Sequence, residues 1–253
     1  EYLTSMHDKC DAVIVLSKKH QAQLLEWNTQ SELRLMPTGV DPLPAPTANE
    51  VASFKKKYGI QKNDKVILYA GRISKEKNLD LLLEAYSSFI APTNPNVKLL
   101  FAGDFDYREE LEQKARATGL GERIIFTGHF QRQKLGVVYA SADVFAFPSL
   151  TDTQGLVLHE AAGAGLPLVL CDAHVSEIFH SNSNGLLAEN EPQDFAEKIM
   201  NILSDAKMIR SMGKKSKEYA AEHTEEKQIK DLEVLYTRSI KNHKKIQFAG
   251  GEW

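Results

Sequence analysis

Short runs of consecutive apolar residues alternate along the chain with longer segments in which apolar residues recur at helical spacing. The near-continuous hydrophobicity of the short runs is typical of strands that are covered on both faces. The predicted strands are residues 12–16, 33–36, 65–69, 97–102, 123–127, 144–147, 168–170 and 185–188.

The longer segments predict helices at residues 18–27, 50–58, 79–89, 107–118, 132–141, 156–164, 193–203, 206–222 and 225–244. Regular alternation of strands and helices with short connections favours an α/β fold, a Rossmann-like, doubly wound parallel sheet with helices on both faces. Ligands bind to such sheets beyond the carboxyl ends of the strands. We therefore look for chemistry in the loops at 71–78, 103–106, 128–131 and 149–155.

A proline-rich segment at residues 37–46 interrupts this pattern. Three prolines follow Gly39 within it, and they exclude both a helix interior and a central strand, so the segment is a linker or a boundary. Only one β-α-β unit precedes it, which is too small to bury a core of its own. We expect residues 1–40 to be the end of a preceding domain with its linker, 41–236 to be a complete domain, and 237–253 to be a helix end and tail.

Composition and charge narrow the class of protein. The chain has 42% hydrophobic and 26% charged residues and a formal net charge of −3, which is typical of a globular protein and unlike the basic surface of a nucleic-acid binder. No run of about 18 apolar residues predicts a membrane span. The two cysteines lie far apart, so neither a disulfide framework nor a zinc site is expected, and a cytoplasmic location is the default. The chain lacks a start methionine and a signal peptide, so we expect a piece of a longer protein.

The loop at 71–78 has the composition of an anion site. Gly71 permits a sharp turn at the end of a buried strand, and Arg72 and Lys77 follow near the start of a helix. Free N–H groups at a helix N-terminus already favour anions, so two cations there indicate a diphosphate site. A solvated turn with three basic residues is the alternative.

The loop at 149–155 leads into a helix and has the composition of a sugar and ribose site. Asp152 lies in the predicted loop and Glu160 more than one turn into the helix, and carboxylates accept hydrogen bonds from paired hydroxyls. The backbone N–H groups of Gly155, Leu156 and Val157 would face the ligand. Alternatively, Asp152 is only a favourable charge at a helix N-terminus and Glu160 a surface residue.

Taken in order, these motifs resemble those of glycosyltransferase family 4. They are a strand followed by GRxxxxK, the segment ADVFAFPS, an acidic residue followed after seven residues by a glutamate, and AxxAGLPLV. The similarity runs from about Cys10 to about Tyr236. The resemblance implies a retaining transferase with the GT-B fold of two Rossmann-like domains, of which this chain holds the C-terminal donor-binding domain and the end of the first.

The resemblance also implies roles for single residues. Arg72 and Lys77 would hold the donor diphosphate and Glu160 the ribose, while Asp152 stands where the family has a glutamate that touches the sugar and is one methylene shorter. Gly155 and Leu156 would lend backbone contacts, and His129 and Phe130 would lie against the base. Gln154 replaces a common aromatic residue in the donor site, and the run 151–156 is similar to members that glucosylate diacylglycerol, which hints at a lipid acceptor.

One motif competes with this interpretation. Asp104-Phe105-Asp106 follows a strand and reads as DxD, a metal-binding signature of the other major glycosyltransferase fold. The family that this chain resembles has a glycine turn at this place, matched by Gly103, and binds its donor without metal. We therefore expect neither a metal nor another cofactor.

The resemblance implies a hexosyltransferase that uses a nucleoside diphosphate sugar, with UDP-glucose as the family-level choice and a lipid or glycan as acceptor. The acceptor site would lie mainly on the missing N-terminal domain, so the chain alone would bind donor without transferring sugar. A nucleotide-sugar epimerase and a non-catalytic nucleotide-binding module remain as alternatives. A dinucleotide-dependent dehydrogenase is disfavoured because no G-x-G-x-x-G follows a strand. Peripheral contact of the final helix with anionic lipid on the inner membrane face remains an open alternative.

Overall fold

The protein is built on a six-stranded, wholly parallel sheet in the order β5-β4-β3-β6-β7-β8. The computed structural model describes residues 2–249, and the side chains of residues 5–242. The strands of this sheet are β3 (Lys65–Ala70), β4 (Val97–Ala102), β5 (Ile124–Phe126), β6 (Val144–Phe147), β7 (Leu168–Leu170) and β8 (Gly185–Leu187). The predicted doubly wound α/β fold is confirmed. Of the predicted helix end and tail at 237–253, residues 250–253 lie outside the described residues.

Two layers of helices cover the sheet. α3 (Ala48–Lys57), α6 (Arg132–Ala140), α7 (Leu156–Ala164) and α9 (Ala206–Ala221) pack in succession against one another on one side. α4 (Leu79–Glu84), α5 (Arg108–Ala117) and α8 (Pro192–Leu203) pack together on the other. Every residue of the central strand β6 is buried, which is why its sequence reads as an unbroken apolar run.

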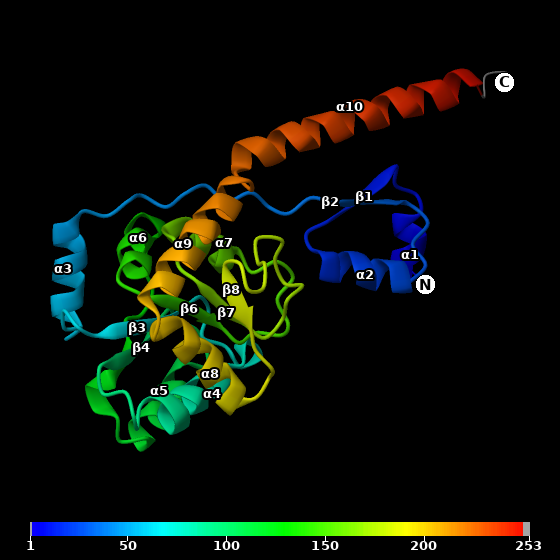
Figure 1. The fold of residues 1–253 in the computed structure, drawn as a ribbon. Helices are drawn as coiled ribbons and strands as arrows, with labels where there is room; N and C mark the ends of the chain where they lie inside the picture. Colours follow the sequence, from blue (N-terminus) through cyan, green and yellow to red (C-terminus); the bar gives the residue numbers. More distant parts are fainter. Residues whose placement is uncertain (1, 250–253) are drawn as a thin grey trace.

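The first residues form a separate small unit. α1 (Tyr2–His7), β1 (Ala12–Val15), α2 (Lys18–Glu26) and β2 (Glu32–Leu35) make a β-α-β unit with a two-stranded parallel sheet, beside the main domain in Figure 1. Lys18 and Lys19, at the start of α2, form ion pairs with Glu177 and Asp172 of the main domain at 2.8 and 2.6 Å. The unit thus leans on the main domain, as its small size requires. The exact domain boundaries stay a prediction.

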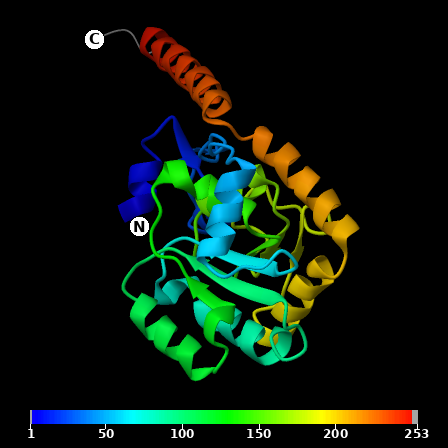
Figure 2. The same cartoon turned by 90° about the vertical axis from the view of Figure 1, so that its left-hand side faces the viewer.

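The linker after β2 crosses the top of the main domain to reach α3, and it passes the corner between α9 and α10 (Glu225–Ala249) (Figure 1). Gly39 lies so close to this corner that a Cβ there would collide with the carbonyl oxygen of Thr224. Val40 N–H donates to the carbonyl of His223 at 2.9 Å. α10 then projects away from the body (Figure 2). Among the helices within residues 2–249, none has the length and apolar character needed to cross a membrane.

Several local details differ from the sequence prediction. α1 was not predicted, and the helix expected at 79–89 is α4 followed by a π-helical segment, η2 (Ala85–Ile90). The wider turn accompanies the burial of Tyr86, whose hydroxyl donates to the carbonyl of Val97 at 2.7 Å. Two 3₁₀ turns, η1 (Lys75–Lys77) and η3 (Gly121–Arg123), lie in connecting segments. Apolar spacing does not distinguish these tighter or wider turns from an α-helix, since their periods are similar.

Candidate functional site

A pocket of about 230 Å³ opens at the carboxyl ends of β3, β4 and β5. Parallel strands end at this edge, so their following loops converge there. The pocket brings together several of the residues that the sequence singled out, namely Gly71, Arg72, His129, Phe130, Val157 and Glu160. Its remaining lining residues are Ala70, Ala102, Gly103, Asp104, Leu135 and Tyr139. The lining does not include Lys77, Asp152, Gln154, Gly155 or Leu156.

Two glycines form the floor of the pocket where β3 and β4 end. Gly71 has φ +143°, a conformation that favours glycine, and its N–H donates to the carbonyl of Ala102 at 3.0 Å. A Cβ on Gly103 would collide with the carbonyl oxygen of Gly71. The two loops therefore approach each other more closely than a side chain at Gly103 would permit. Because neither glycine carries a side chain, room for a ligand remains above them.

Glu160 presents a largely buried carboxylate, with a side chain that is 10% exposed, to the same pocket from the second turn of α7. The hydroxyl of Tyr139 donates to Oε2 at 2.9 Å, and the guanidinium of Arg132 pairs with Oε1 at 2.8 Å. Burial, and next the negative charge of Glu160, raise the pKa of Tyr139, so this residue stays a neutral donor. Each carboxylate oxygen keeps acceptor capacity for further hydroxyl groups.

Arg72 is the exposed cation of the pocket. Its side chain is 59% exposed and lies 3.4 Å from Glu76, and its guanidinium lies 5.4 Å from the ring centre of Phe105. The hydroxyl of Tyr69 donates to the backbone carbonyl of Arg72 at 2.7 Å. The backbone is thus fixed while the charged group stays in solvent, where an anionic ligand can reach it.

Lys77, the other predicted cation, is buried and paired with a residue of the second loop. Its Nζ lies 2.8 Å from Oδ1 of Asp152, and the two side chains are 10% and 17% exposed. The other carboxylate oxygen of Asp152 is buried without a hydrogen-bond partner within the described part of the chain. This ion pair joins the two predicted loops, and the role of Lys77 on the donor diphosphate stays a prediction.

The side chain of Gln154, which was predicted to lie in the donor site, forms hydrogen bonds with the linker. Its side-chain oxygen accepts from the N–H of Thr38, and its side-chain nitrogen donates to the carbonyl of Thr38, both at 2.9 Å. The next residue, Gly155, precedes α7 with φ +63°, which favours glycine, and Leu156 is 47% exposed. Like the other N–H groups of the first helical turn, those of Leu156 and Val157 have no partner within the helix.

The carboxylate of Asp104, the first residue of the DxD motif, is already engaged. Oδ2 lies 3.1 Å from the guanidinium of Arg108, and Oδ1 accepts from the N–H of Phe105 at 2.9 Å. Within the described part of the chain, no group of three or more His, Cys, Asp or Glu side chains is arranged to hold a metal ion. The absence of a metal requirement stays a prediction.

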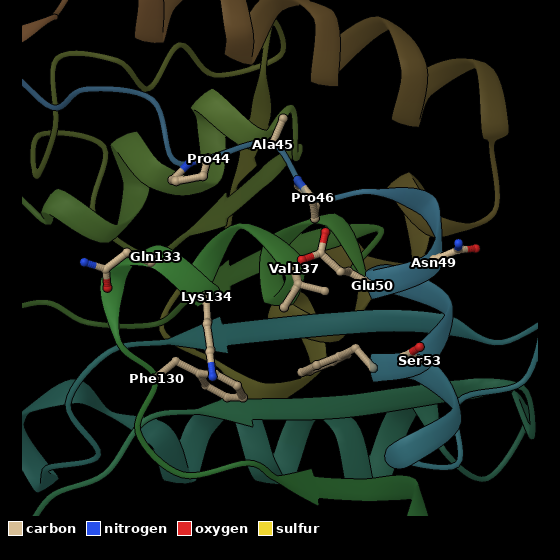
Figure 3. Close-up of a pocket in the computed structure, with 11 residues that line it drawn as sticks. Pro44, Ala45, Pro46, Asn49, Glu50, Ser53, Phe130, Gln133, Lys134 and Val137 are labelled. Carbon is tan, nitrogen blue, oxygen red and sulfur yellow. The ribbon is translucent and has the colours of Figure 1, made fainter.

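A larger pocket of about 410 Å³ shares Phe130 with the smaller one, and Figure 3 shows the residues that line it. The linker residues Pro44–Pro46, α3 and α6 supply its walls, and its lining is mainly apolar. Its lining includes the charged residues Glu50 and Lys134. The carboxylate of Glu50 already caps α3, because it accepts from the N–H of Thr47 at 2.7 Å, so Lys134 is the charged group that remains for a ligand. The glycine floor and the buried carboxylate therefore distinguish the smaller pocket as the candidate site.

His159 lies beside Glu160 on α7 but is buried and does not line the pocket. Its Nε2 is 3.1 Å from the hydroxyl of Ser176, and its ring packs against His223. Burial, with a smaller contribution from His223, lowers its pKa from 6.5 to about 4. The folded protein therefore keeps this ring neutral at pH values where an unfolded chain protonates it.

The free energy of unfolding is expected to fall as the pH falls from 6.5 to 4, because only the unfolded state binds a proton at His159 over that range. The slope is about 1.4 kcal/mol per pH unit, or about 3 kcal/mol by pH 4. Denaturant unfolding at a series of pH values measures it. The variant His159→Leu should show a flatter profile, and parallel profiles would contradict the assignment.

Two residues of the site were not predicted from the sequence. Arg132 begins α6, directly after the loop of His129 and Phe130. A cation at the start of this helix is the one sequence signal from which the place of Arg132 in the site could have been predicted. Tyr139 gives no such signal, because an aromatic residue on a helix face usually belongs to the core. Only the packing of α6 against α7 brings its hydroxyl to Glu160.

The sequence matches the model of one protein family, described as glycosyl transferases group 1, over residues 50–219, about two-thirds of the chain. Among its curated relatives is an alpha-monoglucosyldiacylglycerol synthase of Acholeplasma laidlawii, 26% identical over 94% of this chain and 61% of the relative. The enzyme of the same name from Streptococcus pneumoniae is 31% identical over 65% of this chain and 38% of the relative. This chain thus spans less than two-thirds of the length of each of these relatives.

Solved structures show the same architecture. Sucrose-phosphate synthase from Thermosynechococcus elongatus superposes with a TM-score of 0.82 at 25% identity, over 95% of this chain and 61% of that one. Anabaena HepE, solved in complex with UDP and glucose, gives a TM-score of 0.81 at 22% identity, over 93% of this chain and 66% of that one. These neighbours are GT-B glycosyltransferases, which confirms the predicted fold. With the family match over residues 50–219, the chain belongs to the glycosyl transferases group 1 family.

Proposed function

We propose that this chain binds a nucleoside diphosphate hexose such as UDP-glucose, and that the protein transfers the hexose with retention to a lipid or glycan. The observation that carries the proposal is that Arg72, the paired glycines and the buried carboxylate of Glu160 line one pocket at the carboxyl edge of the sheet. A cation and a carboxylate in one pocket suit a diphosphate joined to a ribose. The complex of HepE with UDP and glucose supports this donor class.

In this proposal each part of the donor has its own contacts. Arg72 and the first N–H groups of α7 bind the diphosphate and stabilise its charge as the glycosidic bond breaks. Glu160 binds the ribose hydroxyls, and His129 and Phe130 lie against the base. Asp152, held by Lys77, orients the hexose. A metal ion is not part of the proposal.

The acceptor is the second half of the proposal. We place its site mainly on a domain of which residues 1–40 are the last part, so that the chain alone binds donor without transferring sugar. The names of two relatives, alpha-monoglucosyldiacylglycerol synthases, support a glycolipid acceptor. A peripheral contact of the protein with the inner membrane face is a further part of the proposal.

Titration calorimetry with UDP-glucose tests the proposal. The wild-type chain should bind, and Arg72→Met should weaken binding about tenfold, because one charge-assisted hydrogen bond to phosphate is lost. Arg116→Met removes a similarly exposed arginine, 66% exposed, from α5 and should have no effect. Adding EDTA should leave binding unchanged. A wild-type chain that binds neither UDP-glucose nor another nucleotide sugar would overturn the proposal.

A further inference from the structure

The loop at 149–155, which carries Asp152, is held near both ends by residues that precede the main domain. Near its start, the carbonyl of Leu150 accepts from the Nζ of Lys19 at 2.6 Å. Near its end, Gln154 makes its two hydrogen bonds with the main chain of Thr38. The residue is only 4% exposed, so water does not compete for its amide.

Thr38 is itself firmly anchored. The next residue, Gly39, packs against the backbone of Thr224 without space for a side chain, and Val40 donates to the carbonyl of His223. The N–H of Glu225 also donates to the carboxylate of Asp41 at 3.3 Å. The linker at 38–41 is therefore a fixed support for the loop and not a free tether.

The same linker also reaches the other half of the site. The guanidinium of Arg132, which pairs with Glu160, donates to the carbonyl of Asp41 at 3.1 Å. The linker thus contacts a neighbour of each of the two carboxylates, Asp152 and Glu160, that the proposed function assigns to the hexose and the ribose. Both contacts use backbone groups of the linker, so they depend on its path and not on its side chains.

We infer that Gln154 is a positioning residue of the proposed hexose site, which ties the loop of Asp152 to the linker through its two hydrogen bonds with Thr38. The inference rests on the proposed function and adds a residue that acts through Asp152 without touching the donor. Only an amide side chain offers a donor and an acceptor side by side to match the N–H and carbonyl of one residue. When this link is broken, Asp152 is no longer held against Lys77 at the place where the hexose binds.

The variant Gln154→Met tests the inference, since it keeps the size of the side chain and removes both hydrogen bonds. Titration calorimetry compares UDP-glucose with UDP. We expect the dissociation constant for UDP-glucose to rise about tenfold, because binding of the hexose must then also order the released loop, while that for UDP changes less than about twofold. Gln154→Leu is a second neutral variant that lacks both hydrogen bonds, and it serves if the methionine variant fails to fold.

Asn184 supplies a matched control at the opposite edge of the sheet. Its side chain is fully buried and, like that of Gln154, bonds two backbone groups, the carbonyl of Ile178 and the N–H of His180, both at 2.8 Å. Asn184→Leu should lower the melting temperature and leave both dissociation constants unchanged. If Asn184→Leu behaves in this way, a general loss of stability does not explain a selective loss of affinity for UDP-glucose in Gln154→Met.

The outcomes separate the inference from the proposed function. If the wild-type chain binds UDP-glucose and Gln154→Met loses affinity for it but not for UDP, the inference is supported. If the variant binds both ligands as the wild type does, or loses affinity for both equally, Gln154 is not a positioning residue of the hexose site, and the proposed function stands. If the wild-type chain binds no nucleotide sugar, the proposed function fails and the inference fails with it.

Discussion

Replacing Lys77 by methionine is expected to lower the free energy of unfolding by about 3 kcal/mol, because it leaves the carboxylate of Asp152 buried without its cation. The ion pair measures 2.8 Å, and the second oxygen of Asp152 has no partner within the described residues that could compensate. Denaturant unfolding of the variant and the wild type measures the difference.

The double variant Lys77→Met with Asp152→Asn separates the structural role of this pair from its proposed role in the hexose site. Removing both charges should restore most of the stability, since the cost lies in the unpaired charge. Binding of UDP-glucose should stay weak, because the group that orients the hexose is absent. Lys98→Met breaks another buried pair, with Asp64 at 3.8 Å, and should cost stability without affecting donor binding. A stable Lys77→Met variant would show that Asp152 is solvated.

The variant Glu160→Ala is expected to weaken binding of UDP and of UDP-glucose at least a hundredfold. Two charge-assisted hydrogen bonds from the ribose hydroxyls are lost, each worth about 1.5–3 kcal/mol. Because the ribose is common to both ligands, the loss should be equal for both, in contrast to the selective loss expected at Gln154. Titration calorimetry with each ligand measures it.

Asp143 provides the matched control for this carboxylate. It also accepts from two donors, Lys65 at 3.0 Å and the N–H of Val66 at 2.9 Å, but at the amino-terminal end of β3. Asp143→Ala should lower stability and leave binding intact. The variant Glu160→Gln, which keeps one acceptor oxygen, should bind better than the alanine variant. Wild-type affinity in Glu160→Ala would place the ribose elsewhere and remove the basis of the proposed function.

The sequence alone determined the sheet, the linker and the loops that converge on the pocket. Strands such as β6 are buried on both faces, and burial requires apolar side chains at successive positions, so their positions can be read locally. The close approach of the two loops is likewise marked by glycine at Gly103, because a Cβ there would collide with the carbonyl oxygen of Gly71. The family motifs added the candidate roles of Arg72, Asp152 and Glu160.

Only the tertiary structure decided which side chains meet. Lys77, which was predicted to hold the donor diphosphate with Arg72, forms an ion pair with Asp152, 75 residues away. Gln154 was expected in the donor site, and its amide bonds Thr38, 116 residues away, while Tyr139 reaches Glu160 through the packing of two helices. Local patterns record whether a residue is buried, but the partner of a polar group depends on the path of the whole chain. Those partnerships therefore had to be observed in the folded protein.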